Sequence, residues 1–288
     1  MTKVRGTLQV VATPIGNLAD LSPRAQEVLR AAAVIAAEDT RRTLQLLKSV
    51  GIVRPLISLY EHNEAQRVPQ LLARLEAGET VALVSDAGTP LLSDPGFELV
   101  RAAARAGFTV QAIPGPSAIT TALAAAGLPA QRFCFEGFLP ARGAERRAAL
   151  AALAHEPRTL VFFEAPHRII ATLTDMVAEF GAQREAVVAR ELTKVHERIY
   201  RGTLAQLLAC ARADENFARG EITLVLTGAA AEQGAQAQPP ELRRTVDILL
   251  KELPPGRAAA LAAQLTGATR AAAYALATRK AHPEGPEP

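Results

Sequence analysis

The sequence predicts an α/β protein with two α/β domains, the first built on a parallel sheet and the second on a mixed sheet, followed by a small helical C-terminal domain. In the first half of the chain, short apolar runs alternate with helical patterns, as a parallel sheet requires. In the second half the apolar runs lie closer together, and the short connection at 192–195 indicates an antiparallel hairpin. A stretch of small and polar residues at 229–240 then precedes a helical C-terminal segment.

The elements of the first domain follow from local patterns. A strand is expected at 7–12, and a helix at 23–32 because Ser22 can cap its N-terminus and Pro23 suits the first helical position. Further strands are expected at 34–37, 56–60, 80–85 and 108–113. Further helices are expected at 40–50, 63–77, 97–106 and 117–126.

The second half of the chain contains five more apolar runs. They predict strands at 133–138, 159–164, 185–191, 196–201 and 221–227. The helical pattern of the C-terminal segment is interrupted at Pro254-Pro255 and at Gly267. We therefore divide the chain into a first α/β domain at 1–117, a second at 118–228, a linker at 229–240, a helical domain at 241–281 and a tail at 282–288.

The composition is that of an ordinary globular protein. A chain of 288 residues with 49% hydrophobic and 21% charged residues can bury a core, which excludes disordered and disulfide-scaffold classes. Prolines interrupt the uncharged stretch at 108–131, and residues 1–30 lack the pattern of a signal peptide. Cys134 and Cys210 are far apart and have no CxxC partner. We therefore expect a cytoplasmic protein with reduced thiols and no membrane contact.

Several common catalytic motifs are missing from the sequence. It has no GxxxxGK[ST] phosphate loop, no GxGxxG dinucleotide fingerprint, no GxSxG nucleophile and no HExxH zinc motif. The sequence therefore predicts an α/β protein whose chemistry uses neither a metal nor a phosphate loop.

Three polar loops follow predicted strands of the first half, at 13–17, 85–96 and 114–118. Open α/β sheets bind ligands at the carboxyl ends of their strands. The loop at 85–96 combines glycines, prolines, hydroxyls and carboxylates, which suits a polar ligand with an apolar edge. Each loop taken alone could be no more than a tight turn.

Three further stretches place charged residues together. Residues 164–168 (EAPHR) follow a strand and open a helix, a position that favours anions. Residues 190–198 (RELTKVHER) could face a cleft, or could be a solvated hairpin edge that guards against aggregation. Residues 38–42 (EDTRR) could be a functional junction or simply an acidic helix cap with surface arginines.

The positive charge of the chain is concentrated near its C-terminus. The net charge is only +3, but residues 241–280 carry seven Lys or Arg against three Asp or Glu. Such a segment could bind nucleic acid. It could equally be a solvated helical face, or an appendage for packing or dimerisation.

Six motifs in this order resemble the ribosomal RNA small-subunit methyltransferase I family of the tetrapyrrole methylase superfamily. They are VVATPIGNL at 10–18, AEDTR at 37–41, VSDAGTP at 84–90, IPGPSA at 113–118, EAPHR at 164–168 and ARELTK at 189–194. The resemblance spans roughly residues 8–227, and residues 253–280 are similar to the small C-terminal helical domain of the family.

This resemblance implies a fold, a cofactor and a reaction. It implies that S-adenosylmethionine is held in the cleft between the two α/β domains, and that the protein is a homodimer. It implies 2′-O-methylation of a cytidine in the decoding region of 16S rRNA, in the small ribosomal subunit. Carried over onto this chain, the cofactor-binding residues would be Ile15, Asp86, Gly88, Thr89, Pro90, Leu92, Ser117, Ala118 and Ala165.

Residue types and placement also suggest catalytic roles. Lys194 would stabilise the developing alkoxide of the ribose or act as a base, and His167 or Glu191 would accept the proton. Arg168 would contact phosphate. The expected RNA-binding residues are Arg243, Arg244, Arg257, Arg270, Arg279 and Lys280. One alternative is a tetrapyrrole C-methyltransferase of the precorrin type, against which the basic C-terminal segment argues. The other is a non-catalytic nucleic-acid-binding protein, against which the cofactor loops argue.

Overall fold

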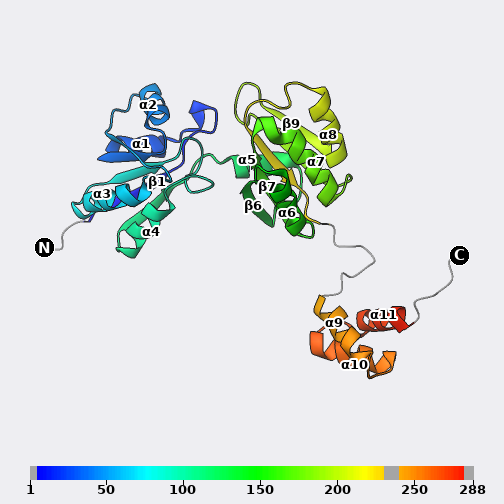
Figure 1. Cartoon of the computed structure of the whole chain (residues 1–288). Coiled ribbons are helices and arrows are strands. Elements are labelled where there is room, and N and C mark those ends of the chain that lie inside the picture. The colour runs from blue at the N-terminus through cyan, green and yellow to red at the C-terminus, as the bar shows by residue number, and fades with distance from the viewer. Residues whose placement is uncertain (1–4, 230–239, 282–288) are drawn as a thin grey trace. The chain divides into compact units, whose positions relative to one another are not determined.

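The computed structural model describes residues 5–229 and 240–281 (Figure 1). The chain forms two compact units that divide between residues 229 and 230. The first unit contains two five-stranded sheets, and the described part of the second unit, residues 240–281, is built from helices. The predicted class of two α/β domains followed by C-terminal helices is therefore confirmed, whereas the exact domain boundaries stay predictions.

The first sheet is entirely parallel. Its strands are β1 (Thr7–Val11), β2 (Val34–Ala37), β3 (Leu56–Ser58), β4 (Val81–Val84) and β5 (Thr109–Ile113). Their order in the sheet is β3-β2-β4-β1-β5, with Leu8 of β1 paired to Val81 on one side and to Val110 on the other. The loops after β4, β1 and β5 therefore lie next to one another at one edge of the sheet.

Helices cover both faces of this sheet. They are α1 (Pro23–Ala31), α2 (Thr40–Ser49), α3 (Glu64–Glu76) and α4 (Phe97–Arg105). The α3 and α4 side chains Leu71, Leu75 and Leu99 join one buried cluster, and Leu29 and Leu47 of α1 and α2 join the cluster on the other face. As predicted, α1 begins at Pro23, and the Ser22 hydroxyl accepts a hydrogen bond from the Ala25 N–H at 3.1 Å.

The second sheet is mixed. Its strands are β6 (Phe133–Phe138), β7 (Thr159–Glu164), β8 (Glu185–Arg190), β9 (Arg198–Thr203) and β10 (Ile222–Leu226). Their order is β6-β7-β10-β8-β9, in which only β6 and β7 form a parallel pair. The antiparallel β8–β9 pair confirms the hairpin that the short connection predicted.

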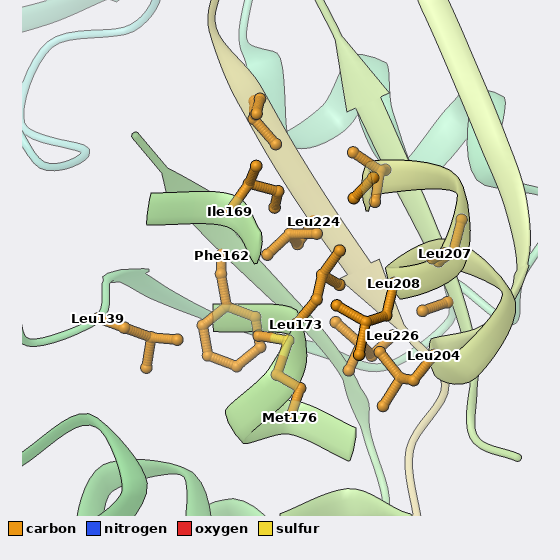
Figure 2. Packing of buried hydrophobic residues seen from close by; sticks show 14 of the residues in the cluster. Leu139, Phe162, Ile169, Leu173, Met176, Leu204, Leu207, Leu208, Leu224 and Leu226 are labelled. Atoms are coloured by element: carbon orange, nitrogen blue, oxygen red, sulfur yellow. The ribbon is translucent and has the colours of Figure 1, made fainter. Parts of the chain in front are cut away.

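The second sheet also has helices on both faces. The helices α6 (Gly143–Leu153), α7 (Ile169–Phe180) and α8 (Leu204–Ala213) cover one face, while α5 (Ala118–Ala126) packs on the other. Figure 2 shows the first of these layers, where Phe162 and Leu224 meet Leu173 and Met176 of α7. The neighbouring Val161 belongs to the α5 side, as strand alternation requires.

The structure differs from the sequence-based expectations in two places within the second domain. Helices α6 and α8 were not predicted, although Thr203 and Gln206 form a capping box at the start of α8. The strand expected at 196–201 lies two residues later, because tight turns occupy the preceding segment, where Glu191 and Thr193 adopt positive φ angles of 54° and 64°.

The second unit is a small three-helix body. Its helices are α9 (Pro240–Leu249), α10 (Pro255–Thr266) and α11 (Arg270–Ala281), with breaks at the predicted proline pair and at Gly267. Leu242, Val246 and Ala273 lie in its core. Residues 230–239 of the predicted linker and the tail from 282 lie outside the described residues. Among the helices that are described, none combines the length and the hydropathy needed to cross a bilayer.

Candidate active site

Backbone contacts join the three polar loops at the edge of the first sheet. Thr13 and Gly88 exchange two backbone hydrogen bonds, with N···O distances of 2.9 and 3.0 Å, which connect the β1 and β4 loops. The Thr89 hydroxyl donates to the Pro116 carbonyl at 3.1 Å, which connects the β4 and β5 loops. The loops thus form one continuous surface rather than three independent turns.

This surface forms one wall of a cavity of about 480 Å³. Eight of the nine residues expected to hold the cofactor line it, namely Ile15, Asp86, Gly88, Thr89, Leu92, Ser117, Ala118 and Ala165. The ninth, Pro90, is buried but is not part of the lining. The structure therefore brings the predicted residues together at one place.

The second domain forms the opposite wall. It contributes Phe138 from the end of β6, Phe163 and Glu164 from β7, and the segment 220–223 at the start of β10. Of these, Glu164 belongs to a motif that the sequence singled out, while Phe138 and Glu221 carry no sequence signal beyond their strands. The cavity therefore lies between the two α/β domains of the first unit.

Carboxylates dominate the charge of the first wall. Glu38, Asp86 and Asp94 line the cavity, and Asp86 is paired with Arg42 at 3.2 Å and accepts a hydrogen bond from the Asp39 N–H at 2.9 Å. Burial, together with the charges of Glu38 and Asp86, raises the pKa of Asp94 to about 6, although a hydrogen bond with Ser85 opposes the shift. Burial and the charge of Asp86 also raise the pKa of Glu38. A cationic ligand would relieve this repulsion.

Lys194 lies beside the cavity within a small ionic network. Its Nζ is 2.8 Å from Oε1 of Glu191 and 3.2 Å from Oε2 of Glu221, and Glu221 itself lines the cavity. A Cβ atom at Gly16 would lie 2.4 Å from Cγ of Lys194, so the bare backbone at this position makes room for the lysine stem. The network therefore joins the β1 loop of the first domain to the second domain.

The network determines the protonation of its members. Burial alone would lower the pKa of Lys194, but the hydrogen bond to Glu191 and the charge of Glu221 outweigh it and raise that pKa. Burial alone would raise the pKa of Glu191, but hydrogen bonds from Lys194 and from the Glu221 N–H leave it below its ordinary value. At neutral pH Lys194 is therefore a cation and Glu191 a carboxylate, which favours charge stabilisation by Lys194 over base catalysis.

None of the four predicted catalytic residues is part of the cavity lining. Lys194 and Glu191 lie beside it, next to Glu221, whereas His167 and Arg168 have other surroundings. His167 is exposed and is not part of the lining. Arg168 donates hydrogen bonds to the carbonyls of Leu139 and Pro140 at 2.5 and 3.1 Å and pairs with Glu164 at 3.2 Å. The expected phosphate contact of Arg168 does not suit this arrangement, because its guanidinium is used within the protein.

The C-terminal unit presents arginines on its surface. Arg243 and Arg244 on α9, Arg257 on α10 and Arg270 on α11 are all exposed. The side chains of Arg279 and Lys280 lie outside the described residues. Across the described part of the chain, no group of three or more His, Cys, Asp or Glu side chains is arranged to hold a metal ion.

Curated relatives match the chain over nearly its whole length. The ribosomal RNA small subunit methyltransferase I of Xylella fastidiosa strain Temecula1 is 56% identical over 269 residues, which cover 93% of this chain and 98% of the relative. The protein of the same name from Pseudomonas aeruginosa is 51% identical, covering 96% of this chain and 98% of the relative.

Family models and solved structures agree with these relatives. The model described as tetrapyrrole (corrin/porphyrin) methylases matches residues 7–208, and the one described as the RsmI C-terminal HTH domain matches residues 236–280. The fold is similar to that of a uroporphyrin-III C-methyltransferase from Thermus thermophilus in complex with S-adenosylhomocysteine, with a TM-score of 0.52 and 19% identity over 77% of this chain and 97% of that one. By its sequence identity along almost its full length, the chain belongs to the ribosomal RNA small subunit methyltransferase I family, within the tetrapyrrole methylases.

Proposed function

We propose that this protein transfers a methyl group from S-adenosylmethionine to the ribose 2′-hydroxyl of a cytidine in the decoding region of 16S rRNA. The observation that carries the proposal is the 56% identity to a ribosomal RNA small subunit methyltransferase I across 93% of this chain and 98% of the relative.

The cavity fits S-adenosylmethionine in size and in chemistry. Its volume of about 480 Å³ lies within the range of about 300–1,000 Å³ that is usual for sites of small molecules. Glu38, Asp86 and Asp94 complement a ligand that carries a sulfonium and an ammonium charge. Ile15 and Leu92 offer apolar contacts for an aromatic ring system.

The residues beside the cavity supply what a ribose nucleophile needs. S-adenosylmethionine, when bound, supplies a methyl group that its sulfonium charge has already activated. Lys194 places a positive charge beside the cavity, where it can stabilise a developing alkoxide. Glu221 is the carboxylate of the network that lines the cavity, so we assign it the acceptance of the hydroxyl proton, and we assign Glu191 the positioning of Lys194.

The decisive experiment is methyl transfer from labelled S-adenosylmethionine to small ribosomal subunits that lack the modification. Mass spectrometry of the digested RNA should find 2′-O-methylcytidine at one decoding-region site. Free 16S rRNA is compared in parallel, to establish whether the assembled subunit is the substrate. A methylated base, or no transfer to either RNA, would contradict the proposal.

The two alternative functions have less support. Tetrapyrrole methyltransferases share the fold, but the solved structures are about 20% identical, whereas the relatives that match both units are named rRNA methyltransferases. A non-catalytic binding protein would have no use for a cavity that keeps eight of the nine expected cofactor residues together.

Binding of the cofactor is expected to depend on the ionisation of Asp94. Because its pKa is about 6 and a cation favours the carboxylate form, affinity for S-adenosylmethionine should rise as the pH passes upward through 6. Titration calorimetry between about pH 5 and pH 8 should show tightening of about three- to tenfold for the wild type. The Asp94→Asn variant should bind weakly and lose this dependence, and an unchanged pH profile would contradict the assignment.

The same substitution should stabilise the protein near neutral pH. The folded-state pKa of about 6 exceeds the ordinary value of 3.8, so the folded protein binds more protons than the unfolded chain in this interval and loses stability as the pH rises through it. Full conversion of a shift of this size would correspond to about 3 kcal/mol, but Asp94 is partly exposed, so we expect Asp94→Asn to gain about 1 kcal/mol above pH 6. Urea denaturation of the unliganded wild type and variant measures this difference in the free energy of unfolding.

The C-terminal unit is proposed to hold the RNA backbone. Its α10 and α11 are joined by the short turn at 267–269, and exposed arginines lie on all three helices. We therefore keep Arg243, Arg244, Arg257 and Arg270 as RNA contacts, together with Arg279 and Lys280 from the sequence alone. Guanidinium groups suit bidentate contacts with phosphate.

Removing these charges should weaken RNA binding in a salt-dependent way. With the four described arginines changed to glutamine, the slope of log affinity against log salt should fall by about one for every phosphate that the variant no longer binds. Fluorescence anisotropy with a decoding-region RNA measures the slope. A matched variant with Arg24, Arg54, Arg105 and Arg212 changed to glutamine removes four exposed charges from the first unit and should have little effect. Equal effects from both sets would contradict the proposal.

We further propose that the protein acts as a homodimer in the cytoplasm. The dimer follows from the family resemblance. The compartment follows from the two isolated cysteines, which suit reduced thiols, and the cytoplasm is where ribosomal subunits are available to an rRNA-modifying enzyme. Analytical ultracentrifugation of the full chain across concentrations tests the dimer, and fractionation of cells tests the compartment.

A further inference from the structure

An aromatic side chain at the mouth of the cavity is not used by the mechanism above. Phe138 lines the cavity and is 56% exposed, which makes it more exposed than Leu92 at 40% or Ile15 at 7%. Its ring lies 5.6 Å from that of Phe163, which also lines the cavity. One side of Phe138 is thus supported by the second domain, while much of the rest is open.

A β-bulge places Phe138 on the cavity side of its sheet. On β6, Phe135 pairs with Val161 and Phe138 with Phe163, so three steps along β6 match two steps along β7. In a regular strand, residues 135 and 138 would lie on opposite faces. The extra residue puts both on the same face, since Phe135 and Phe138 each contact the ring of Phe163.

The bulge lies close to the loop that follows β4 in the first domain. Gly137 has a φ of +66°, and a Cβ atom at this position would lie 3.2 Å from Oγ of Ser93. Ser93 and Leu91 themselves have positive φ angles of 70° and 76°, which are costly for residues other than glycine. Positive φ angles therefore occur on both walls next to Phe138, and those of Leu91 and Ser93 are costly, whereas that of Gly137 is accessible because it is glycine.

The proposed reaction would bring an extruded base close to the cavity. A ribose inside a folded RNA reaches a cavity only when its nucleotide leaves the stack, and proteins commonly receive the extruded base on an aromatic side chain. A cofactor is mostly enclosed by the inner walls, whereas the exposed mouth is where a macromolecular substrate enters. We propose that Phe138 stacks on the base of the target cytidine. The inference rests on the proposed function and identifies the base-binding surface of the same site.

Kinetics with unmodified small subunits test the proposal. For Phe138→Ala, kcat/KM for the RNA substrate should fall about 5- to 150-fold, which corresponds to a base-stacking free energy of about 1–3 kcal/mol. The Kd of S-adenosylmethionine, measured by calorimetry, should stay within about twofold. Phe138→Tyr keeps the ring and should retain activity, while Phe138→Leu should lose it despite a similar apolar volume.

The strand itself provides a matched control. Phe133 lies at the other end of β6, is 41% exposed and is not part of the cavity lining, so Phe133→Ala should leave kcat/KM unchanged. Unchanged kcat/KM in Phe138→Ala, or an equal loss in Phe133→Ala, would overturn the proposal. Weaker cofactor binding in Phe138→Ala would assign the ring to the cofactor instead. A wild-type enzyme that methylates no rRNA would overturn the proposed function itself, which the parallel wild-type reaction reveals separately.

Discussion

Replacing Lys194 by methionine is expected to lower kcat about 100-fold while leaving the Kd of S-adenosylmethionine unchanged. The variant removes the positive charge that lies 3.2 Å from the cavity-lining Glu221, and charge stabilisation of this kind contributes about 100- to 1,000-fold in rate. Methionine keeps an unbranched stem in the narrow space beside Gly16. Single-turnover methyl transfer at saturating RNA and cofactor measures the effect.

Two further variants separate the charge of Lys194 from its packing. Lys194→Arg retains a cation and should recover activity to within about tenfold of the wild type. Arg198→Met removes a charge from the same hairpin, where Arg198 is 65% exposed and pairs with Asp214, and it should change kcat little. If Lys194→Met keeps its kcat to within about threefold, the network is structural and the role of Lys194 is wrong.

Replacing Asp175 by alanine is expected to cost more stability than any other change considered above, about 3–5 kcal/mol. Asp175 on α7 accepts hydrogen bonds from Arg146 on α6 with N···O distances of 2.7 Å, and the two side chains are only 12% and 7% exposed. The alanine variant leaves the buried guanidinium without its counter-charge. Thermal unfolding of the first unit should shift downward by roughly 6–20 °C.

The same helix offers a matched control for this pair. Arg142 and Glu145 form an ion pair on α6, but their side chains are 83% and 57% exposed, so Glu145→Ala should change stability by less than about 1 kcal/mol. An Arg146→Met and Asp175→Leu double variant should regain most of the loss, because no charge is left buried. A loss below about 1 kcal/mol in Asp175→Ala would show that Arg146 finds other partners.

Most of the first domain could be predicted from local sequence. The strands β2 and β4 are buried along their whole length, so they occur in the sequence as short, uncharged apolar runs. Helix α1 begins where Ser22 and Pro23 provide a cap and a first residue. Helices α6 and α8 were missed, since the small and alanine-rich side chains of both give little periodic contrast.

The location of the cavity was predicted in part. The loops after β1, β4 and β5 could be named because parallel strands end at a common edge, and the motifs of the family marked the same residues. Asp94 lay within one of these loops, but no local pattern distinguished it. Phe138 could not be found at all, since strand alternation places it on the wrong face unless the bulge is known.

The contacts of Arg168 could not be predicted from the residues around it in the sequence. Its position at the start of a helix suggested contact with phosphate, yet its guanidinium binds the carbonyls of Leu139 and Pro140, 29 and 28 residues earlier in the chain. In the same way, the raised pKa of Lys194 depends on its hydrogen bond to Glu191 and also on the charge of Glu221, which is brought to it by the pairing of β8 with β10. The partners and the protonation of a charged side chain thus depend on residues that are far away in the sequence and close in the fold.

The sequence by itself determined the secondary structure of the first domain, the three polar loops at the edge of its sheet and the family. These features depend on spacing along the chain, because burial periodicity, helix caps and motifs act over a few residues. Only the tertiary structure decided which side chains share the cavity, which carboxylates are forced together and which aromatic ring is left open at the mouth. Those properties depend on strand order and on distances between segments that are far apart in sequence. Electrostatic interactions and close packing are set by these distances.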